Sequence, residues 1–336
     1  MTPHLAFGIA DPSQVGEARR AAVRLATDIG LDEVASGRVP LAVTELRTNL
    51  SRHATGGRLL IAAHADGDRR GLDVLSLDNG PGMADVDRCL ADGYSTSGTP
   101  GTGLGAVQRL CDEFSMFSVL GRGTVIFGRV LQPQARFGTS TPAPCFVFGA
   151  VCLAAPGETV CGDAWSFRAD GNRASVIIAD GLGHGPVTAE AADAALAIFA
   201  SRPGGGPAQL LTLAHAALRS TRGAAVAVAD LDAVAGTALF CGAGNIAGRL
   251  ISGIADRSLL SQHGTVGLQI RRLQDVPYEW GEHAILVLHS DGLVTRWTLA
   301  GVGGLLQCHP VVIAGWLIRE QVRGRDDATV VVVRRR

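Results

Sequence analysis

The chain has 336 residues, which is enough for two domains that each bury a core of their own. Its formal net charge of −1 argues against a nucleic-acid footprint and against a polybasic membrane patch. All thirty basic residues are arginine, and this absence of lysine excludes a P-loop and a eukaryotic-type protein kinase, which both need a lysine at the phosphates.

Hydropathy and cysteine usage indicate the compartment. No apolar run approaches the roughly 18 residues that span a bilayer, and no signal peptide precedes Pro3. Seven cysteines, an odd number without a CxxC pair, favour reduced thiols over disulfides or a zinc site. These features predict a cytoplasmic protein without a membrane partner.

The first 132 residues show alternating strand patterns and helical apolar spacing. The predicted elements are a strand over 4–9, a helix from Asp11 or Ser13 to about Ile29, a helix over 31–53 that Pro40 kinks or divides, strands over 59–65 and 72–77, a helix start over 106–110, and a hairpin of 114–120 with 124–131.

Residues 78–105 carry two glycine clusters that suggest a nucleotide site. Asp78 enters a turn in which Gly80 and Gly82 let the backbone approach a ligand closely. The second cluster leads into a helix start, where backbone N–H groups can hold phosphates. Its residues are Gly101, Thr102, Gly103, Leu104 and Gly105. Residues 94–99 between the clusters have the composition of a lid, although either cluster alone is as often an ordinary turn.

A pair of polar residues on the helix over 31–53 strengthens this interpretation. Glu45 and Asn49 are four residues apart and therefore share one helix face. An acid beside a neutral oxygen ligand suits a general base next to one Mg²⁺. Singly, each residue would more often be solvated or capping.

In this order the motifs resemble those of the GHKL-type ATPases, over residues 4–131, and most closely the anti-sigma-factor serine kinases of the stressosome switch type. The resemblance implies a Bergerat α/β sandwich that binds ATP with Mg²⁺. It implies Glu45 as the base for a protein hydroxyl, Asn49 as the Mg²⁺ ligand and Asp78 as the acceptor of the adenine amino group. Thr124 takes the place of a threonine in the base pocket, although a threonine that only fills a strand is as common.

Residues 133–144 are rich in Pro, Ser and Thr and read as a linker, so that the predicted domains cover 1–132 and 145–336. In the second domain the predicted strands are 146–153, 174–179, 224–230, 237–241, 284–289 and 328–333, and the predicted helices are 187–200, 208–220 and 311–322.

Acidic residues in this second domain recur at strand ends. They stand in the motifs CGDAW, DGLGHG, SDG and DDAT, at Asp163, Asp180, Asp291 and Asp326. A single aspartate there is usually a turn former, but four of them suit divalent cations, which prefer carboxylate oxygens.

This set resembles the metal-dependent protein phosphatases (PPM family) in their SpoIIE-type branch, over residues 145–334. The resemblance implies an αββα sandwich and an α+β protein of two domains. It implies two Mn²⁺ or Mg²⁺ ions bridged by Asp163 and Asp180 with help from the Gly181 carbonyl, and completed by Asp291 and Asp326. The role of Asp327 stays open, and His184 is either a proton-transfer residue or, more often for a lone histidine, structural.

Together the two resemblances imply a bifunctional regulator, a kinase fused to a phosphatase, that acts on STAS-domain antagonists or stressosome-type proteins of a partner-switching pathway. The alternatives are an ATP module that only captures a sigma factor or second regulator, and one whose ATP occupancy gates the phosphatase. A homodimer is a further expectation from the related kinases.

Overall fold

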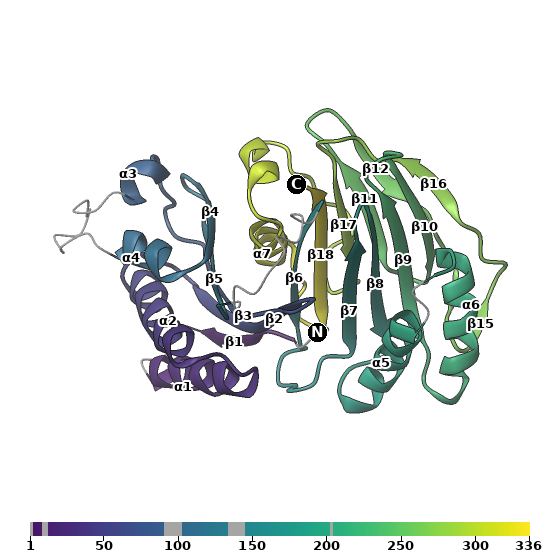
Figure 1. The fold of residues 1–336 in the computed structure, drawn as a ribbon, viewed down its shortest axis with the longest axis horizontal. Helices are drawn as coiled ribbons and strands as arrows, with labels where there is room; N and C mark the ends of the chain where they lie inside the picture. Colours follow the sequence, from purple (N-terminus) through teal and green to yellow (C-terminus); the bar gives the residue numbers. More distant parts are fainter. Residues whose placement is uncertain (1–2, 9–12, 91–102, 134–144, 202–203) are drawn as a thin grey trace. The chain divides into compact units, whose positions relative to one another are not determined.

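The computed structural model describes residues 3–8, 13–90, 103–133, 145–201 and 204–336. The chain divides into two compact units (Figure 1). Most of each unit is contiguous in sequence and lies on one side of the predicted linker, which falls outside the described residues except for Pro133. One segment differs, because Gln307–Arg319 groups with the N-terminal unit.

The N-terminal unit contains one antiparallel sheet with helices on it. Its strands are β1 (Leu5–Gly8), β2 (Arg58–Asp66), β3 (Arg69–Asp78), β4 (Glu113–Val119) and β5 (Gly123–Leu131), in the order β1-β2-β3-β5-β4. Its helices are α1 (Ser13–Asp28), α2 (Glu33–His53), α3 (Val86–Leu90) and α4 (Gly103–Leu110).

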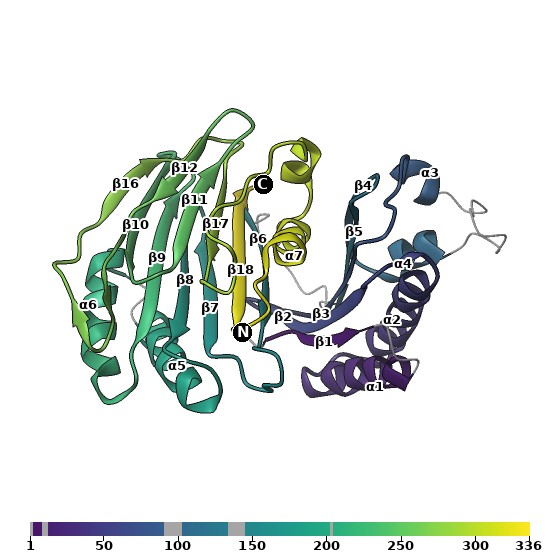
Figure 2. The ribbon, with the colours of Figure 1, turned by 180° about the vertical axis from the view of Figure 1, so that it is seen from behind.

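The helices α1, α2 and α4 cover one face of this sheet (Figure 2). Small residues of α1, such as Ala22, let it approach closely, while Leu46 of α2 and Val107 of α4 are fully buried against strand residues such as Val74. Because side chains alternate along a strand, the odd-numbered residues of β3 face the other side of the sheet. The predicted strands and helices of this unit are all present, and α2 runs through Pro40 without a break.

The C-terminal unit contains two sheets packed face to face. One has the order β13-β10-β9-β8-β7 with β16 paired to β10, and the other has the order β12-β11-β17-β18-β6. The first comprises β7 (Asp163–Asp170), β8 (Arg173–Gly181), β9 (Ala224–Asp232), β10 (Thr237–Ala243), β13 (Ser261–Gln262) and β16 (Val276–Glu279). The second comprises β6 (Phe146–Leu153), β11 (Ala247–Ile251), β12 (Asp256–Leu259), β17 (Ile285–His289) and β18 (Ala328–Arg335).

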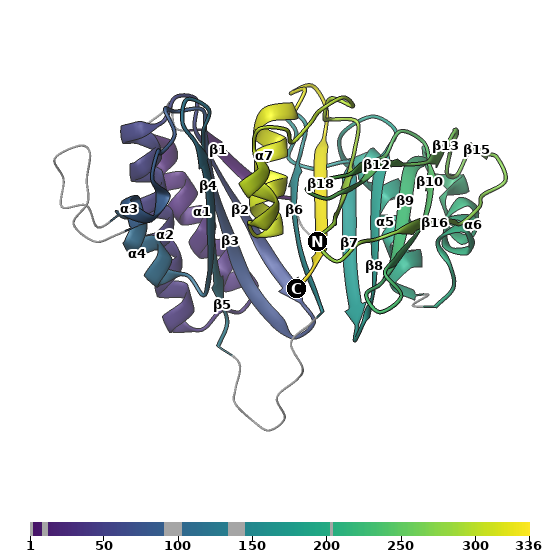
Figure 3. The ribbon, with the colours of Figure 1, turned by 90° about the horizontal axis from the view of Figure 1, so that it is seen from above.

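Two hydrophobic layers hold this unit together. Between the sheets lie apolar side chains such as Phe148, Ile178 and Leu286. The helices α5 (Pro186–Ser201) and α6 (Pro207–Ala217) cover the outer face of the first sheet (Figure 3). The remaining elements are β14 (Gly264–Thr265), β15 (Gln269–Ile270), α7 (Pro310–Gln321) and the short 3-10 helices 218–220 and 303–307.

The α+β class and the two-domain organisation predicted from the sequence are confirmed. The sequence patterns missed β7 and the short strands β11–β16, which have few or mixed apolar residues. The seven cysteines all lie in the described residues, and none of them forms a disulfide. Among the helices that the structure describes, none combines the length and hydropathy needed to cross a membrane.

Candidate functional sites

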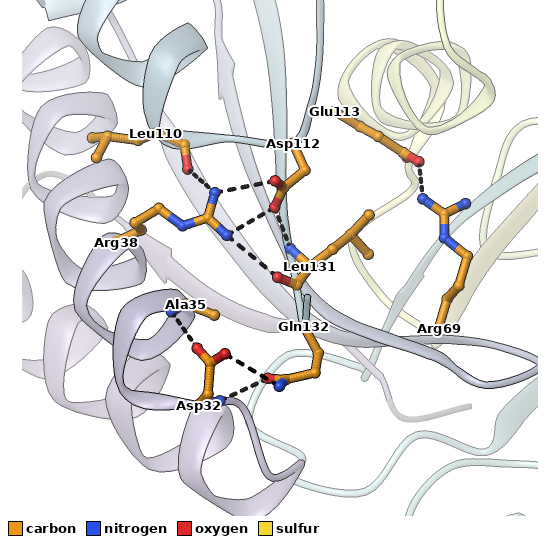
Figure 4. A network of polar contacts seen from close by, with 9 residues as sticks. All are labelled: Asp32, Ala35, Arg38, Arg69, Leu110, Asp112, Glu113, Leu131 and Gln132. Carbon is orange, nitrogen blue, oxygen red and sulfur yellow. Dashed lines mark hydrogen bonds and ion pairs between the residues drawn. The ribbon is translucent and has the colours of Figure 1, made fainter. Parts of the chain in front are cut away.

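Helix α2, which carries Glu45 and Asn49, is fixed in place at its N-terminal end. The Asp32 carboxylate caps the helix by accepting a bond of 2.8 Å from the Ala35 N–H. One turn later the Arg38 guanidinium donates two bonds of 3.1 and 3.0 Å to the Asp112 carboxylate (Figure 4). These two hydrogen bonds between oppositely charged groups hold the helix against the start of β4.

The face of α2 that carries Glu45 and Asn49 points at the second glycine cluster. A Cβ added to Gly103 would lie 3.2 Å from the Asn49 Oδ1 atom and 3.5 Å from a Glu45 Oε atom. The Asn49 amide nitrogen is buried and has no hydrogen-bond partner among the described residues. The structure therefore brings Glu45, Asn49 and Gly103 together.

Of the second glycine cluster, Gly103, Leu104 and Gly105 form the first turn of α4, and Gly105 is buried. Its first two members, Gly101 and Thr102, lie outside the described residues, and so does the predicted lid over 94–99.

The Asp78 loop meets the other end of α2. A Cβ on Gly80 would lie 2.7 Å from the His53 carbonyl oxygen, so only glycine fits between the loop and the helix end. The Gly80 N–H donates a bond of 2.8 Å to the Asp78 Oδ1 atom, which fixes the direction of that carboxylate. Burial is the largest influence on the pKa of Asp78 and raises it.

Two further predicted residues border this loop. Thr124 on β5 is the strand partner of Asp78 on β3, and its hydroxyl oxygen lies 2.9 Å from that of Ser118. Gly82 has a φ of +68°, in the left-handed region that favours glycine. Glu45, Asn49, Asp78 and Thr124 thus belong to elements that all border one another.

In the C-terminal unit, Asp163 and Asp180 stand opposite each other. They are register partners at the start of β7 and the end of β8. The Asp163 Oδ2 atom accepts a bond of 2.6 Å from the Ser290 hydroxyl. Its Oδ1 atom is buried without a hydrogen-bond partner among the described residues, so it is available to a cation.

Burial and like charges together perturb this pair. The pKa of Asp163 is raised to about 7 and that of Asp180 to about 9, and burial is the largest cause for both. The negative charges of Asp291 and Asp327 contribute to both of these raised values, and Asp326 contributes at Asp180. Carboxylates that repel one another in a buried place are chemically suited to a divalent cation.

These shifts predict that the metal-free protein loses stability as the pH rises from 7 to 8.5. In this range the unfolded chain, with aspartate pKa values near 3.8, has released protons that the folded chain still holds on Asp180. Folding therefore takes up protons, and the free energy of unfolding falls with rising pH.

Thermal unfolding in EDTA at several pH values measures this trend. Added Mn²⁺ is expected to raise the midpoint more at pH 8.5 than at pH 7, because the ion competes with fewer protons. A midpoint in EDTA that is flat over this range would contradict the raised pKa of Asp180.

The other acidic positions differ in how they are held. The Asp291 Oδ2 atom accepts a bond of 2.7 Å from the Asn245 amide. Asp327, whose role the sequence left open, accepts the N–H groups of Ala155 at 2.8 Å and Gly162 at 2.9 Å. Both Asp327 oxygens are thus occupied by the loop between β6 and β7, which favours a structural role.

The described residues contain no group of three His, Cys, Asp or Glu side chains that is placed to hold a metal ion. The structure therefore brings Asp163 and Asp180 together, while the complete predicted ligand set with Gly181, Asp291 and Asp326 stays a prediction. His184 has a side chain that is 61% exposed, and its Nδ1 atom lies 2.9 Å from the Glu158 carboxylate.

Sequence reasoning assigned no role to Ser290, which lies in the SDG motif and orients Asp163, or to Asn245, which lies in the CGAGN stretch and orients Asp291. Ser290 stands inside a motif that the sequence analysis noted for its aspartate alone. A hydroxyl and an amide gain such a role only when folding places a carboxylate beside them.

Replacing Ser290 by alanine is expected to lower the affinity for Mn²⁺ by about 10- to 100-fold, since such a bond orients a ligand carboxylate. Calorimetric titration of the folded variant with Mn²⁺ measures the effect. Ser166, a partly buried serine on β7, offers a control with the same change. Equal affinities in Ser290→Ala and the wild type would show that this bond does not orient Asp163.

Comparison with known proteins finds two family models that match separate parts of this chain. The family model of the histidine kinase-like ATPase domain matches residues 9–127, and that of stage II sporulation protein E (SpoIIE) matches residues 170–336. The serine/threonine-protein kinase RsbT of Bacillus subtilis (strain 168) is 40% identical over 109 residues, which is 32% of this chain and 82% of that protein.

Two solved structures are similar as well. One, described as "The bacterial stressosome: a modular system that has been adapted to control secondary messenger signaling", has a TM-score of 0.53 at 27% identity and covers 56% of this chain and 99% of its own. The other, RsbX in complex with magnesium, has a TM-score of 0.50 at 18% identity and covers 57% of this chain and 96% of its own. At that identity the likeness to RsbX shows the fold alone.

Proposed function

This chain belongs to the RsbT-type histidine kinase-like ATPases through its N-terminal part and carries a SpoIIE-type phosphatase domain after it, and from this premise we propose a bifunctional regulator of partner switching. One domain phosphorylates serine or threonine on a partner protein, and the other removes such phosphates. The observation that best supports the kinase half is the meeting of Glu45 and Asn49 at Gly103.

In the kinase half, Glu45 takes the proton from the hydroxyl of the protein substrate. Asn49 would hold the Mg²⁺ that accompanies ATP through its Oδ1 atom, which faces Gly103. The Asp78 carboxylate, which the Gly80 N–H orients, accepts a hydrogen bond from the adenine amino group. Because phosphoryl transfer needs mainly positioning and charge neutralisation, a small domain without lysine is sufficient.

In the phosphatase half, Asp163 and Asp180 would hold a pair of Mn²⁺ or Mg²⁺ ions between them, with Gly181, Asp291 and Asp326 as the other ligands. When bound, such ions supply positive charge for a phosphoryl group and lower the pKa of water. Ser290 keeps Asp163 turned toward the site, and Asn245 does the same for Asp291. His184, beside Glu158, is placed on an exposed loop where it could exchange protons with solvent.

The substrates we propose are STAS-domain proteins of the stressosome type, because RsbT is a relative of the kinase half and one similar structure is described as a stressosome. A STAS protein encoded beside this chain is the first candidate. The purified chain is incubated with labelled ATP, Mg²⁺ and that protein, and the phosphoprotein is then supplied with Mn²⁺ after ATP is removed.

Transfer of label followed by its release supports the proposal. A complex that forms only with ATP, without transfer of label, would instead make the N-terminal domain a binding switch. Release of phosphate that changes with ATP occupancy, again without transfer, would make it a gate for the phosphatase. If no STAS protein accepts the label and none releases phosphate, the proposed substrate class is refuted.

A further inference from the structure

Helix α7 lies in the sequence of the phosphatase half but packs within the ATPase unit. Its residues from Pro310 to Arg319 are all buried. The Trp316 ring meets Phe117 of β4 edge to face at 4.9 Å, and His309, just before the helix, stacks on Phe127 of β5 at 4.7 Å. Helix α7 thus covers the sheet face that α1 and α2 leave open.

Both ends of this helix are fixed by polar contacts to the same sheet. At its start, the His309 N–H donates a bond of 3.1 Å to the Ser115 hydroxyl oxygen. At its end, the Arg319 Nη1 atom donates to the backbone carbonyl of Asp78 at 2.7 Å and to that of Arg122. The middle allows close approach, since a Cβ on Gly315 would lie 3.1 Å from Leu77.

The contact of Arg319 concerns the proposed adenine site directly. Asp78 ends β3, while Arg122 stands in the turn before β5, so one guanidinium joins the two chain segments that border the site. Arg319 is only 8% exposed, and its guanidinium lies 3.8 Å from the centre of the Trp316 ring, so its own position is well defined.

We propose that Arg319 is a positioning residue for adenine recognition, an inference that rests on the proposed ATP site. It holds the backbone of Asp78 at the carbonyl, while the Gly80 N–H holds the carboxylate, and together these bonds direct the carboxylate toward the adenine amino group. A residue from the phosphatase sequence therefore fixes the backbone of the proposed adenine-binding residue of the kinase domain.

The binding of ATP and the docking of α7 are then thermodynamically linked. If a docked α7 strengthens the binding of ATP, bound ATP must strengthen the docking of α7 by the same factor. Four residues separate the end of α7 at Gln321 from Asp326 of the proposed metal site.

Titration of the full chain with Mg²⁺-ATP and Mg²⁺-ITP tests the proposal, since ITP lacks the amino group that Asp78 accepts. The variant Arg319→Ala is expected to bind ATP about 10-fold more weakly and ITP with nearly unchanged affinity, so that the preference for ATP falls. Arg319→Lys keeps one donor and is expected to recover part of that preference. The control is Arg70→Ala, which removes an exposed arginine of β3 and should change neither affinity.

Equal losses for ATP and ITP, or no loss, in a folded Arg319→Ala would overturn the positioning role. Wild-type chain that binds ATP no better than ITP would overturn the adenine assignment of Asp78 itself, and this role with it. If Arg319→Ala does not fold, hydrogen exchange of the wild type decides. Residues 310–321 should exchange more slowly with ATP than with ITP, and equal protection would refute the link.

Discussion

Replacing Asp180 by asparagine is expected to abolish metal-dependent phosphatase activity and, at the same time, to stabilise the metal-free protein. The loss of activity should be at least about 100-fold, because even residues that only orient a ligand cost 10- to 100-fold. The gain in stability arises because Asp180 has a pKa of about 9 in the folded chain and stays protonated below that pH, whereas the unfolded chain ionises it readily. Ionisation in the unfolded chain alone favours unfolding. Asparagine removes that difference.

The gain at pH 8 is expected to be on the order of a few kcal/mol, or about 5 °C in the midpoint of thermal unfolding in EDTA. Phosphate release from a phosphorylated STAS protein measures the activity, and the shift of the midpoint by Mn²⁺ measures binding. Asp170→Asn is the matched control, since Asp170 is an exposed aspartate at the other end of β7.

Opposite signs for activity and stability distinguish this site from an ordinary structural one. A folded Asp180→Asn that is less stable than the wild type, and still responds to Mn²⁺, would remove Asp180 from the metal site. A loss of activity with no gain in stability would instead leave the ligand role intact and contradict the raised pKa.

Replacing Glu45 by alanine is expected to lower phosphoryl transfer to the partner protein by about 100- to 10,000-fold, the range of general-base catalysis. Binding of Mg²⁺-ATP should stay within about 2-fold, since Glu45 acts on the hydroxyl of the substrate rather than on the nucleotide. Asn49→Ala should lose binding and transfer together, because its side chain would hold the magnesium ion. Transfer of labelled phosphate and calorimetric titration with ATP separate these two effects.

Glu33→Ala offers a control on the same helix, as Glu33 is exposed in the first turn of α2. Because Glu45 and Asn49 both lie beside Gly103, a general disturbance of the pocket would weaken ATP binding in both variants alike. Unchanged transfer in Glu45→Ala would mean that another group takes the proton.

Much of the fold followed from local patterns. The helical spacing of apolar residues located α2, and the four-residue interval between Glu45 and Asn49 placed them on one face. Asp78 and Asp180 could be located because each follows a strand of strongly apolar residues. These are properties of one segment at a time, so the sequence reveals them before folding.

Other features depend on which segments meet. Strand β7 was missed because its residues alternate poorly, yet its pairing with β8 places Asp163 opposite Asp180. Ser290 gained a role only because β17 ends beside that pair. Asp327, next to Asp326 in sequence, turned out to bind two backbone N–H groups of a distant loop.

By itself, the sequence indicated the two families and the residues of two candidate sites, because glycines, carboxylates and their spacing are written along the chain. Only the tertiary structure decided where α7 belongs. Its apolar pattern predicts a buried helix, but such a pattern does not say which sheet the helix packs against. That choice depends on complementary shape and on bonds such as that from Arg319 to the Asp78 carbonyl, which join residues 241 positions apart.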